Sequence, residues 1–367
     1  MQSSISSEEL YWNLKSKKDF VLLDIRSETE HSAWTIYNSI NIPLAKLRNK
    51  YYRIPKNKQI VVFCNRGNDS RLAIGILASK GLNAMALKDG LLEWNQIFDP
   101  VRLSKDIFSQ ITIYQFKRLG KGCLSYILVD HQNNKSYLID PNWQVEIYEN
   151  YIKKNNLPGI SAVIDTHVHA DHVSGGLSAS KKYKVNYLLP SQSKVNFKFL
   201  KLEKHFQKML KNIKADVINT PGHTPESCII VIDKHFAFTG DTLFVDTFGR
   251  VDLHNGDLKK SQKEIYNSIT QKIFQLNDDI YILPSHSSQT MVPGPLRSAS
   301  LRYVKRFNFV NEKTTLEEFM DMVNREELPP PQNYSIIKEI NLRGKKIKDD
   351  LIKELELGNN SCAVKVS

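Results

Sequence analysis

The run His167-Val-His-Ala-Asp-His172 concentrates groups that bind metal ions, because three imidazoles and one carboxylate stand within six consecutive residues. Imidazole nitrogens and carboxylate oxygens are common ligands of zinc and iron in proteins. The preceding segment, residues 161–165, is short and mostly apolar, which is typical of a buried strand. We therefore expect the run to lie where a strand ends, on rigid backbone beside an open cleft.

Three more groups of this kind stand further along the chain. His223 lies in the turn-rich stretch Pro221–Pro225, Asp241 stands at the end of a strand-like stretch, and His286 follows an apolar run. Five of the ten histidines thus fall at such positions, so unrelated structural roles explain the pattern poorly.

These residues allow two kinds of metal centre. His167, His223 and Asp241 form a set of two histidines and one carboxylate, which suits one iron(II) ion with open positions for oxygen. The remaining groups would complete a second metal site or support the first, and a dinuclear zinc centre would favour hydrolysis. They are His169, Asp171, His172 and His286. Counting ligands does not decide between one Fe(II) per chain and two Zn ions.

The order of these motifs resembles the metallo-β-lactamase superfamily over roughly residues 110–345. The resemblance implies an αββα sandwich that places the ligands at strand ends. Within the superfamily, the small apolar residues inside the H-V-H-A-D-H run and the segment Gly249-Arg-Val-Asp252 resemble persulfide dioxygenases. That likeness implies that Arg250 holds the carboxylate of a thiol substrate. Ser287 and Ser288 stand where glutathione-dependent members carry a tyrosine, so the identity of the thiol stays open.

A separate candidate site surrounds Cys64, in the segment Cys64-Asn-Arg-Gly-Asn-Asp-Ser70. The cysteine ends a strand-like run and precedes a helical pattern, so it faces the amides of a curled loop and the positive end of a helix. Both favour thiolate over thiol, and they would also bind an anionic persulfide. Gly67 gives the loop the backbone freedom that it needs.

The surroundings of Cys64 resemble rhodanese domains over about residues 5–100. The resemblance rests on Leu23–Arg26, Asn41–Leu44, the cysteine loop and Lys88–Trp94, in that order. It implies sulfur transfer through a persulfide on Cys64, with substrate bound by the loop residues Arg66, Gly67, Asn68 and Ser70. Asp69 replaces an arginine that is common in the family, so the sulfur donor stays open.

The chain is predicted to be an α/β protein with two domains. Residues 1–103 alternate strand-like and helix-like segments, which predicts a small parallel-sheet domain of the rhodanese-like type. Residues 104–345 carry a succession of short strands and then strand–helix alternation, which fits the metallo-β-lactamase-type αββα sandwich with a C-terminal extension. The charged tail, residues 346–367, is expected to be frayed.

Composition limits the classes of partner. The net charge is +12, but the lysines are spread thinly, which favours a solvated surface over nucleic-acid binding. No stretch is long and apolar enough for a transmembrane helix, and the N-terminus lacks the features of a signal peptide. Four scattered cysteines predict reduced thiols and a cytoplasmic location.

These observations predict iron-dependent oxidation of a low-molecular-weight thiol persulfide to sulfite, coupled to rhodanese sulfur transfer. The expected partners are the persulfide, oxygen, sulfite and thiosulfate, with no nucleic acid and no membrane, and a homo-oligomer stays open. Two alternatives remain: a zinc-dependent thioester hydrolase of the glyoxalase II type, and a sulfur-carrier protein without oxygenase activity. Cys123 is either a packed small residue or a second sulfur-handling thiol.

Overall fold

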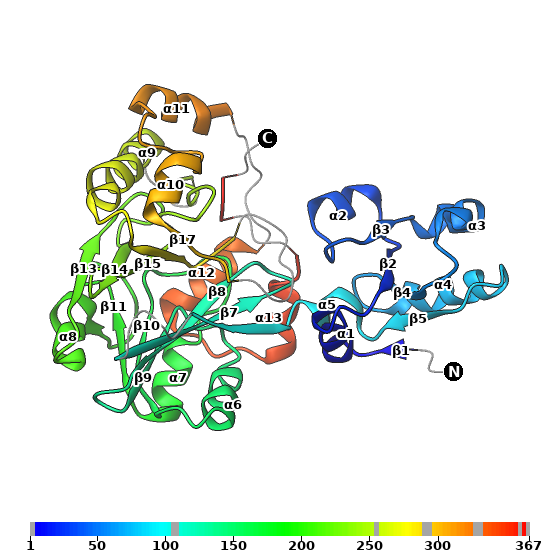
Figure 1. The fold of residues 1–367 in the computed structure, drawn as a ribbon, viewed down its shortest axis with the longest axis horizontal. Coiled ribbons are helices and arrows are strands. Elements are labelled where there is room, and N and C mark those ends of the chain that lie inside the picture. The colour runs from blue at the N-terminus through cyan, green and yellow to red at the C-terminus, as the bar shows by residue number, and fades with distance from the viewer. Residues whose placement is uncertain are drawn as a thin grey trace.

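The computed structural model describes residues 4–103, 110–252, 257–287, 296–325, 333–358 and 362–364. Two bodies of unequal size lie side by side, with the N-terminal one in blue (Figure 1). Within the described ranges, no helix combines the length and the apolar character needed to span a bilayer. All four cysteines fall in these ranges, and no disulfide joins them.

The N-terminal body is a five-stranded sheet in the order β1-β5-β4-β2-β3, with every strand pair parallel. This confirms the predicted parallel α/β domain. Its strands are β1 (Ser4–Ile5), β2 (Phe20–Asp24), β3 (Ile40–Asn41), β4 (Gln59–Phe63) and β5 (Ala84–Leu87). The connecting helices are α1 (Ser7–Lys15), α2 (Glu28–Ala33), α3 (Leu44–Lys50), η1 (Tyr51–Arg53), α4 (Asn68–Ala78) and α5 (Gly90–Trp94).

The larger body contains a seven-stranded sheet, β12-β11-β10-β9-β8-β7-β6, and a five-stranded sheet, β13-β14-β15-β16-β17. The first comprises β6 (Phe98–Arg102), β7 (Ile111–Arg118), β8 (Leu124–Asp130), β9 (Lys135–Ile139), β10 (Ile160–Ile164), β11 (Asn186–Leu189) and β12 (Leu200–Lys201). The second comprises β13 (Ala215–Asn219), β14 (Cys228–Ile232), β15 (Phe236–Gly240), β16 (Tyr281–Pro284) and β17 (Ala299–Ser300).

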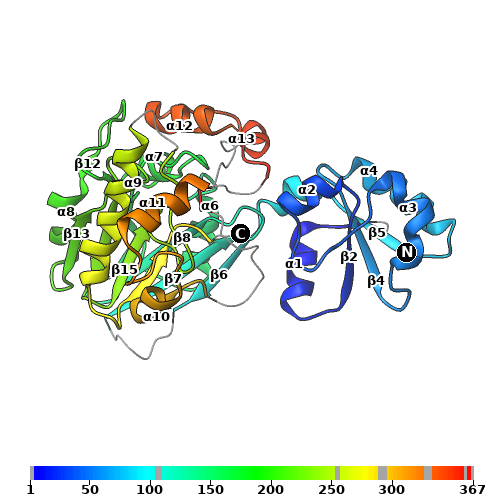
Figure 2. The same cartoon turned by 90° about the horizontal axis from the view of Figure 1, so that it is seen from above.

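The two sheets pack against each other through one apolar core, in which the rings of Tyr126 and Phe238 meet edge to face at 5.0 Å. Helices cover the outer faces, which confirms the predicted αββα sandwich (Figure 2). On the larger sheet they are α6 (Glu146–Lys154) and α7 (Gly176–Tyr183). On the smaller sheet they are α9 (Leu258–Asn267), η2 (Ser268–Lys272), η3 (Ile273–Gln275), α10 (Leu301–Phe307) and α11 (Leu316–Arg325). The other helices are α8 (Leu202–Leu210), which packs into the core between the sheets, and α12 (Tyr334–Arg343) and α13 (Asp349–Leu355), which pack with Val173.

Strand β6 was predicted to belong to the N-terminal domain, which was expected to end at residue 103. It pairs antiparallel with β7 and so belongs to the sheet of the larger body. Asp99 and Pro100 lie inside this strand. The Asp99 carboxylate is buried and accepts hydrogen bonds from Tyr11 and Lys15 of α1, each at 2.7 Å, so it joins the two bodies.

The prediction of a frayed tail after residue 345 is wrong for the residues that the structure describes. Helix α13 lies on the side of the larger body that faces the N-terminal body (Figures 1 and 2). Residues 362–364 return to the sandwich and are buried, with Gly249 and Ala363 forming an antiparallel bridge. Composition suggested a solvated segment, but Lys353, Glu354 and Glu356 pair with residues from distant parts of the chain.

Candidate functional site

The candidate metal ligands come from the ends of four strands in both sheets. The 167–172 run follows β10, His223 follows β13, Asp241 follows β15 and His286 follows β16. Because these strand ends meet at one edge of the sandwich, residues that are far apart in the sequence lie together. All of these ligand candidates are buried.

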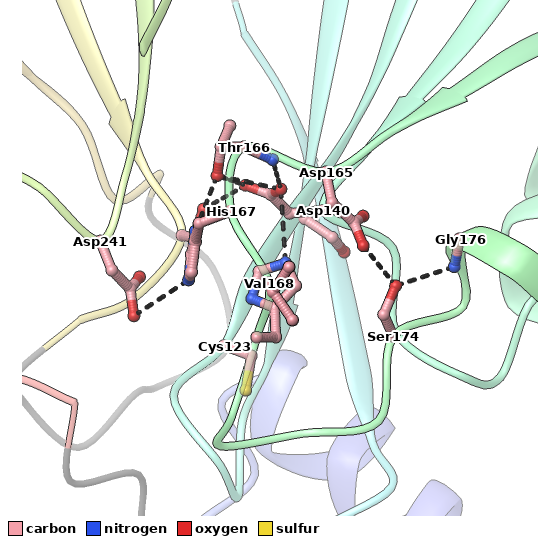
Figure 3. A network of polar contacts seen from close by, with 12 residues as sticks. Cys123, Asp140, Asp165, Thr166, His167, Val168, Ser174, Gly176 and Asp241 are labelled. Carbon is pink, nitrogen blue, oxygen red and sulfur yellow. Dashed lines mark hydrogen bonds and ion pairs between the residues drawn. The ribbon is translucent and has the colours of Figure 1, made fainter. Parts of the chain in front are cut away.

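His167, His223 and Asp241 form one group, in which the candidate ligand atoms all lie within 4.8 Å of one another. Asp241 Oδ2 is 3.8 Å from Nε2 of His167 (Figure 3). The same oxygen is 3.5 Å from Nε2 of His223. Among the described residues, Nε2 of His167 and Oδ2 of Asp241 have no hydrogen-bond partner. Buried polar atoms are normally satisfied, so a cation between these side chains fits the site.

Hydrogen bonds orient both histidine rings toward Asp241. Nδ1 of His223 donates to the Arg250 carbonyl at 2.7 Å. Nδ1 of His167 lies 3.0 Å from the Thr166 hydroxyl, which donates to Asp140 and therefore accepts from the imidazole. Both contacts leave the Nε2 lone pair directed at the centre, in the tautomer that a metal ion requires.

The environment also keeps these two imidazoles neutral. Burial lowers the pKa of His167 well below its usual value, and the charges of His169 and His223 act in the same direction. Burial lowers the pKa of His223 as well, against the opposing effect of Asp241. A neutral imidazole is the form that binds metal.

A second group joins Asp171, His172 and His286 with Cys123, again with candidate ligand atoms within 4.8 Å. Asp171 Oδ2 lies 3.0 Å from Nδ1 of His172, 2.9 Å from Nε2 of His286 and 3.5 Å from Sγ of Cys123. Nδ1 of His286 is 2.5 Å from Oδ1 of Asp241, so Asp241 connects the two groups.

The sequence allowed two interpretations of Cys123, a packed small residue or a second sulfur-handling thiol. In the structure its thiol belongs to this second group. Burial and the Asp171 charge raise the pKa of Cys123, but the charges of His286 and His172 outweigh them and lower it to about 7. A thiol with this pKa is about half thiolate at pH 7, and the thiolate is the nucleophilic form.

His169 lies between the second group and a third cluster, because its Nδ1 is 4.0 Å from Asp171 Oδ1 and its ring centroid is 4.3 Å from that of His172. Its candidate ligand atoms lie with those of Asp140 and Asp165, and its Nε2 is 3.4 Å from Asp140 Oδ1. Sequence reasoning missed both aspartates. Asp140 accepts the backbone N–H of Thr166 at 2.7 Å, and Asp165 accepts a hydrogen bond from Ser174 (Figure 3). Asp165 also accepts from Tyr187. Each aspartate directly follows an apolar strand, which is a signal that could have identified it.

The C-terminal extension supports the same loop. Asn341 of α12 donates to the carbonyls of His169 and His172, each at 2.8 Å. Glu356 is completely buried and accepts the backbone N–H of Val173 at 2.6 Å. Its other carboxylate oxygen accepts from Arg118 at 2.5 Å. The loop that carries four candidate ligands is therefore held from outside by the end of the chain.

Arg250 is buried, and its guanidinium forms a bidentate pair with Asp252, with contacts of 2.9 and 2.5 Å. Asp252 therefore already binds the guanidinium that was predicted to hold a substrate carboxylate.

Two cavities border the centre. One, of about 260 Å³, is lined by His286, Ser287 and Arg297 among others. The other, of about 320 Å³, lies between α7 and α12 and reaches His169. Ser288 is outside the described residues.

The Cys64 loop has the predicted form. Cys64 directly follows β4, and α4 begins at Asn68. The backbone N–H of Gly67 lies 3.1 Å from Cys64 Sγ, and Gly67 has φ +82°, which favours glycine. The Ser70 hydroxyl is buried and has no hydrogen-bond partner among the described residues. Arg66 is not directed at the cysteine, because it pairs with Glu354 of α13 at 2.5 Å.

Two family models match the chain. The rhodanese-like domain model matches residues 6–97, and the metallo-beta-lactamase superfamily model matches residues 119–286. The first range contains Cys64 and the strands β2 to β5, and the second contains the candidate metal ligands.

Relatives with two different activities are similar to this chain. The human protein "Persulfide dioxygenase ETHE1, mitochondrial" is 28% identical over 229 residues, covering 60% of this chain and 83% of that protein. "Hydroxyacylglutathione hydrolase GloC" of Haemophilus influenzae is 30% identical over 195 residues, covering 47% of this chain and 89% of that protein.

Solved structures agree on the fold. A metallo-beta-lactamase from Staphylococcus aureus aligns with a TM-score of 0.58 and 26% identity, covering 65% of this chain and 74% of that one. ETHE1 from Myxococcus xanthus aligns with a TM-score of 0.53 and 24% identity, covering 67% of this chain and 97% of that one.

Proposed function

Since the chain belongs to the metallo-β-lactamase superfamily and carries a rhodanese-like domain ahead of that fold, we propose that it is a persulfide dioxygenase with sulfurtransferase activity. One Fe(II) per chain would be held by His167, His223 and Asp241. The substrate would be the persulfide of a low-molecular-weight thiol, and the product would be sulfite.

The observation that carries this proposal is the pair of unpartnered buried atoms, Nε2 of His167 and Oδ2 of Asp241, beside Nε2 of His223. Three protein ligands leave positions for oxygen and for the persulfide. In contrast, both ring nitrogens of His286 already contact carboxylates, those of Asp241 and Asp171. His286 is therefore the least available of the candidate ligands, whereas Nε2 of His172 has no hydrogen-bond partner among the described residues.

The metal ion, when bound, supplies the binding and activation of oxygen. The chain's own residues do the rest. Arg250 and Thr166 hold the ligand rings through the hydrogen bonds described above. In the net reaction the outer sulfur takes two oxygen atoms from O₂ and one from water. The S–S bond breaks, and the products are the thiol, sulfite and two protons.

Arg250 would bind the carboxylate of the thiol, because a guanidinium pairs with a carboxylate in a bidentate manner. Its present partner, Asp252, is partly exposed, with 42% of its side chain accessible. A substrate carboxylate would therefore displace Asp252 from the guanidinium, and the Asp252 carboxylate would be hydrated instead.

The N-terminal domain would carry sulfane sulfur on Cys64. The thiolate attacks the outer sulfur of a donor, and the sulfur then passes to sulfite, giving thiosulfate. The Gly67 N–H and the start of α4 favour an anion at this position, and the buried Ser70 hydroxyl is a further donor. Sulfite from the larger domain is the natural acceptor, so the two activities would follow each other.

A zinc-dependent thioester hydrolase remains the second candidate, because Asp171, His172 and His286 stand close enough together for a second metal ion and GloC is among the relatives. Metal analysis of the purified chain separates the two. About one iron per chain with oxygen uptake on glutathione persulfide supports the dioxygenase. Two zinc ions per chain with hydrolysis of S-lactoylglutathione supports the hydrolase. Persulfidation of Cys64 without either activity supports a sulfur carrier.

A further inference from the structure

The Cys64 loop offers hydrogen-bond donors to a small anion. The Gly67 N–H lies 3.1 Å from Cys64 Sγ. Helix α4 begins at Asn68, and its N-cap residue Gly67 has no side chain to cap the first turn. The Ser70 hydroxyl is buried and has no hydrogen-bond partner among the described residues. Backbone N–H groups at the start of a helix bind anions, so this loop suits sulfite as well as a persulfide.

Arginine side chains at this loop are held by carboxylates. Nη1 of Arg26 is 3.4 Å from Oδ1 of Asn65, but its guanidinium pairs with Asp24 at 3.1 and 2.6 Å, and both partners are buried. Arg66 makes contacts of 3.1 and 2.5 Å with Glu354 of α13. This second pair keeps 55% and 40% of its side chains exposed, so a small anion from solvent can reach it.

The position of Glu354 is set by its neighbours in the chain. Lys353 donates to Glu93 of the N-terminal body at 2.7 Å. Glu356 is completely buried and pairs with Arg118 at 2.5 Å. Exposed ion pairs are usually weak, in part because two long side chains must be ordered. Here the backbone is fixed on both sides of Glu354, so less entropy is lost when its carboxylate binds the guanidinium.

The carboxylate on Arg66 has the charge and the oxygen donors of the anions that the loop would receive. A guanidinium binds oxyanions through paired N–H groups, and a carboxylate occupies the same groups. A neutral reactant does not depend on them. Occupation of Arg66 by Glu354 therefore raises the concentration that a small anion needs at this site and leaves neutral reactants unaffected.

We propose that Glu354 is a specificity-determining residue of the Cys64 site, where a small anion binds Arg66 only by displacing the Glu354 carboxylate. This inference rests on the proposed sulfurtransferase activity and concerns its acceptor. The sulfur of sulfite attacks the outer sulfur of the Cys64 persulfide. The cysteine S–S bond breaks, its electron pair stays on Cys64, and the new S–S bond is that of thiosulfate. With Glu354 in place, this step becomes fast only when sulfite accumulates.

Alkylation of Cys64 tests this role without any sulfur transfer. Iodoacetate carries a carboxylate and iodoacetamide does not, and both rates are followed on the tryptic peptide 59–66 of the full-length protein. The ionic strength is about 0.15 M, at which exposed charges more than about 8 Å apart are largely screened. Glu354→Gln should raise the ratio of the iodoacetate rate to the iodoacetamide rate about two- to fivefold, which is the upper range for an exposed ion pair.

Two further variants serve as controls. Glu93→Gln also removes one carboxylate and one contact between α13 and the N-terminal body, but it leaves Arg66 untouched. Its ratio should equal that of the wild type. In an Arg66→Gln background, where Cys64 lies on peptide 59–71, Glu354→Gln should no longer change the ratio, since the group for which the two anions compete is gone.

Thiosulfate formation from glutathione persulfide and sulfite provides the second readout. The KM for sulfite should fall in Glu354→Gln by the same factor, with little change in kcat. An unchanged alkylation ratio in Glu354→Gln, an equal rise in Glu93→Gln, or a rise that persists without Arg66 overturns the role of Glu354. A wild type that forms no thiosulfate, although the alkylation ratios change as expected, refutes the sulfurtransferase instead, so the two failures are distinguishable.

Discussion

The carboxylate of Glu356 accepts the backbone N–H of Val173 at 2.6 Å, and its second oxygen accepts from Arg118 at 2.5 Å. Val173 directly follows the last histidine of the metal-binding run. The Glu356 carbonyl also accepts from Asn95 at 2.8 Å, just after the last helix of the N-terminal body. One buried residue therefore joins both bodies to the loop that carries the candidate ligands.

Replacement of Glu356 by glutamine should destabilise the protein strongly. The change leaves the buried Arg118 without a compensating charge, and breaking a buried pair costs about 3–5 kcal/mol. We expect a lower melting temperature and weaker iron binding. Glu354→Gln is the matched control, because that residue pairs with Arg66 at the surface, where loss of the pair costs about 1 kcal/mol or less. Equal melting temperatures for the two variants would contradict this role of Glu356.

His223→Ala and Asp241→Ala should each abolish oxygen uptake and most iron binding, because each removes a proposed ligand and Asp241 also supplies negative charge. His172→Ala should retain bound iron, since His172 lies in the second group of side chains. The measurements are iron per chain and oxygen uptake. A similar loss of metal in all three variants would indicate a dinuclear centre and would refute the mononuclear iron proposal.

Arg250→Ala should chiefly raise KM for an anionic thiol persulfide. A lost charged hydrogen bond costs roughly 1.5–3 kcal/mol, which corresponds to about a 10- to 150-fold increase. Iron content is the control, because the Arg250 carbonyl that holds His223 belongs to the backbone and is retained. If KM stays unchanged in the folded variant, the pairing with Asp252 is the whole role of this side chain.

Alkylation of Cys123 in the metal-free chain should show a midpoint near pH 7. The thiolate is the reactive form, so the rate should rise as the pH increases through the pKa of about 7. His172→Ala removes a positive charge and a hydrogen bond that favour the thiolate, so the midpoint should move to higher pH. Cys228 provides the comparison, because burial raises its pKa well above the usual value. An unchanged midpoint in the variant would exclude His172 as a cause.

Cys64→Ser should abolish thiosulfate formation from persulfide and sulfite, because a serine hydroxyl is not ionised at neutral pH. Oxygen uptake should survive, since the proposed iron ligands all lie after residue 165. Sulfite should then accumulate in place of thiosulfate, which can be measured by separating the two anions. If oxygen uptake stops while iron stays bound, sulfur reaches the metal centre only through Cys64.

The sequence alone determined the parts that depend on local order. A strand followed directly by the 167–172 run predicts ligands at a strand end, and the structure places them there after β10. The Cys64 loop was equally predictable, because its strand, its glycine and its helix are consecutive in the chain. Periodicity and turn residues report such neighbours directly.

Only the tertiary structure decided which distant side chains share a centre. His169 was grouped with Asp171 and His172 from the sequence, and in the structure its ring also contacts Asp140, from the end of a different strand. The tail appeared solvated because its composition is charged, yet Glu356 is buried. Its partner Arg118 is 238 residues away in the sequence. Burial of a charge depends on a partner that folding brings near, and the spacing of residues along the chain carries no information about such a pair.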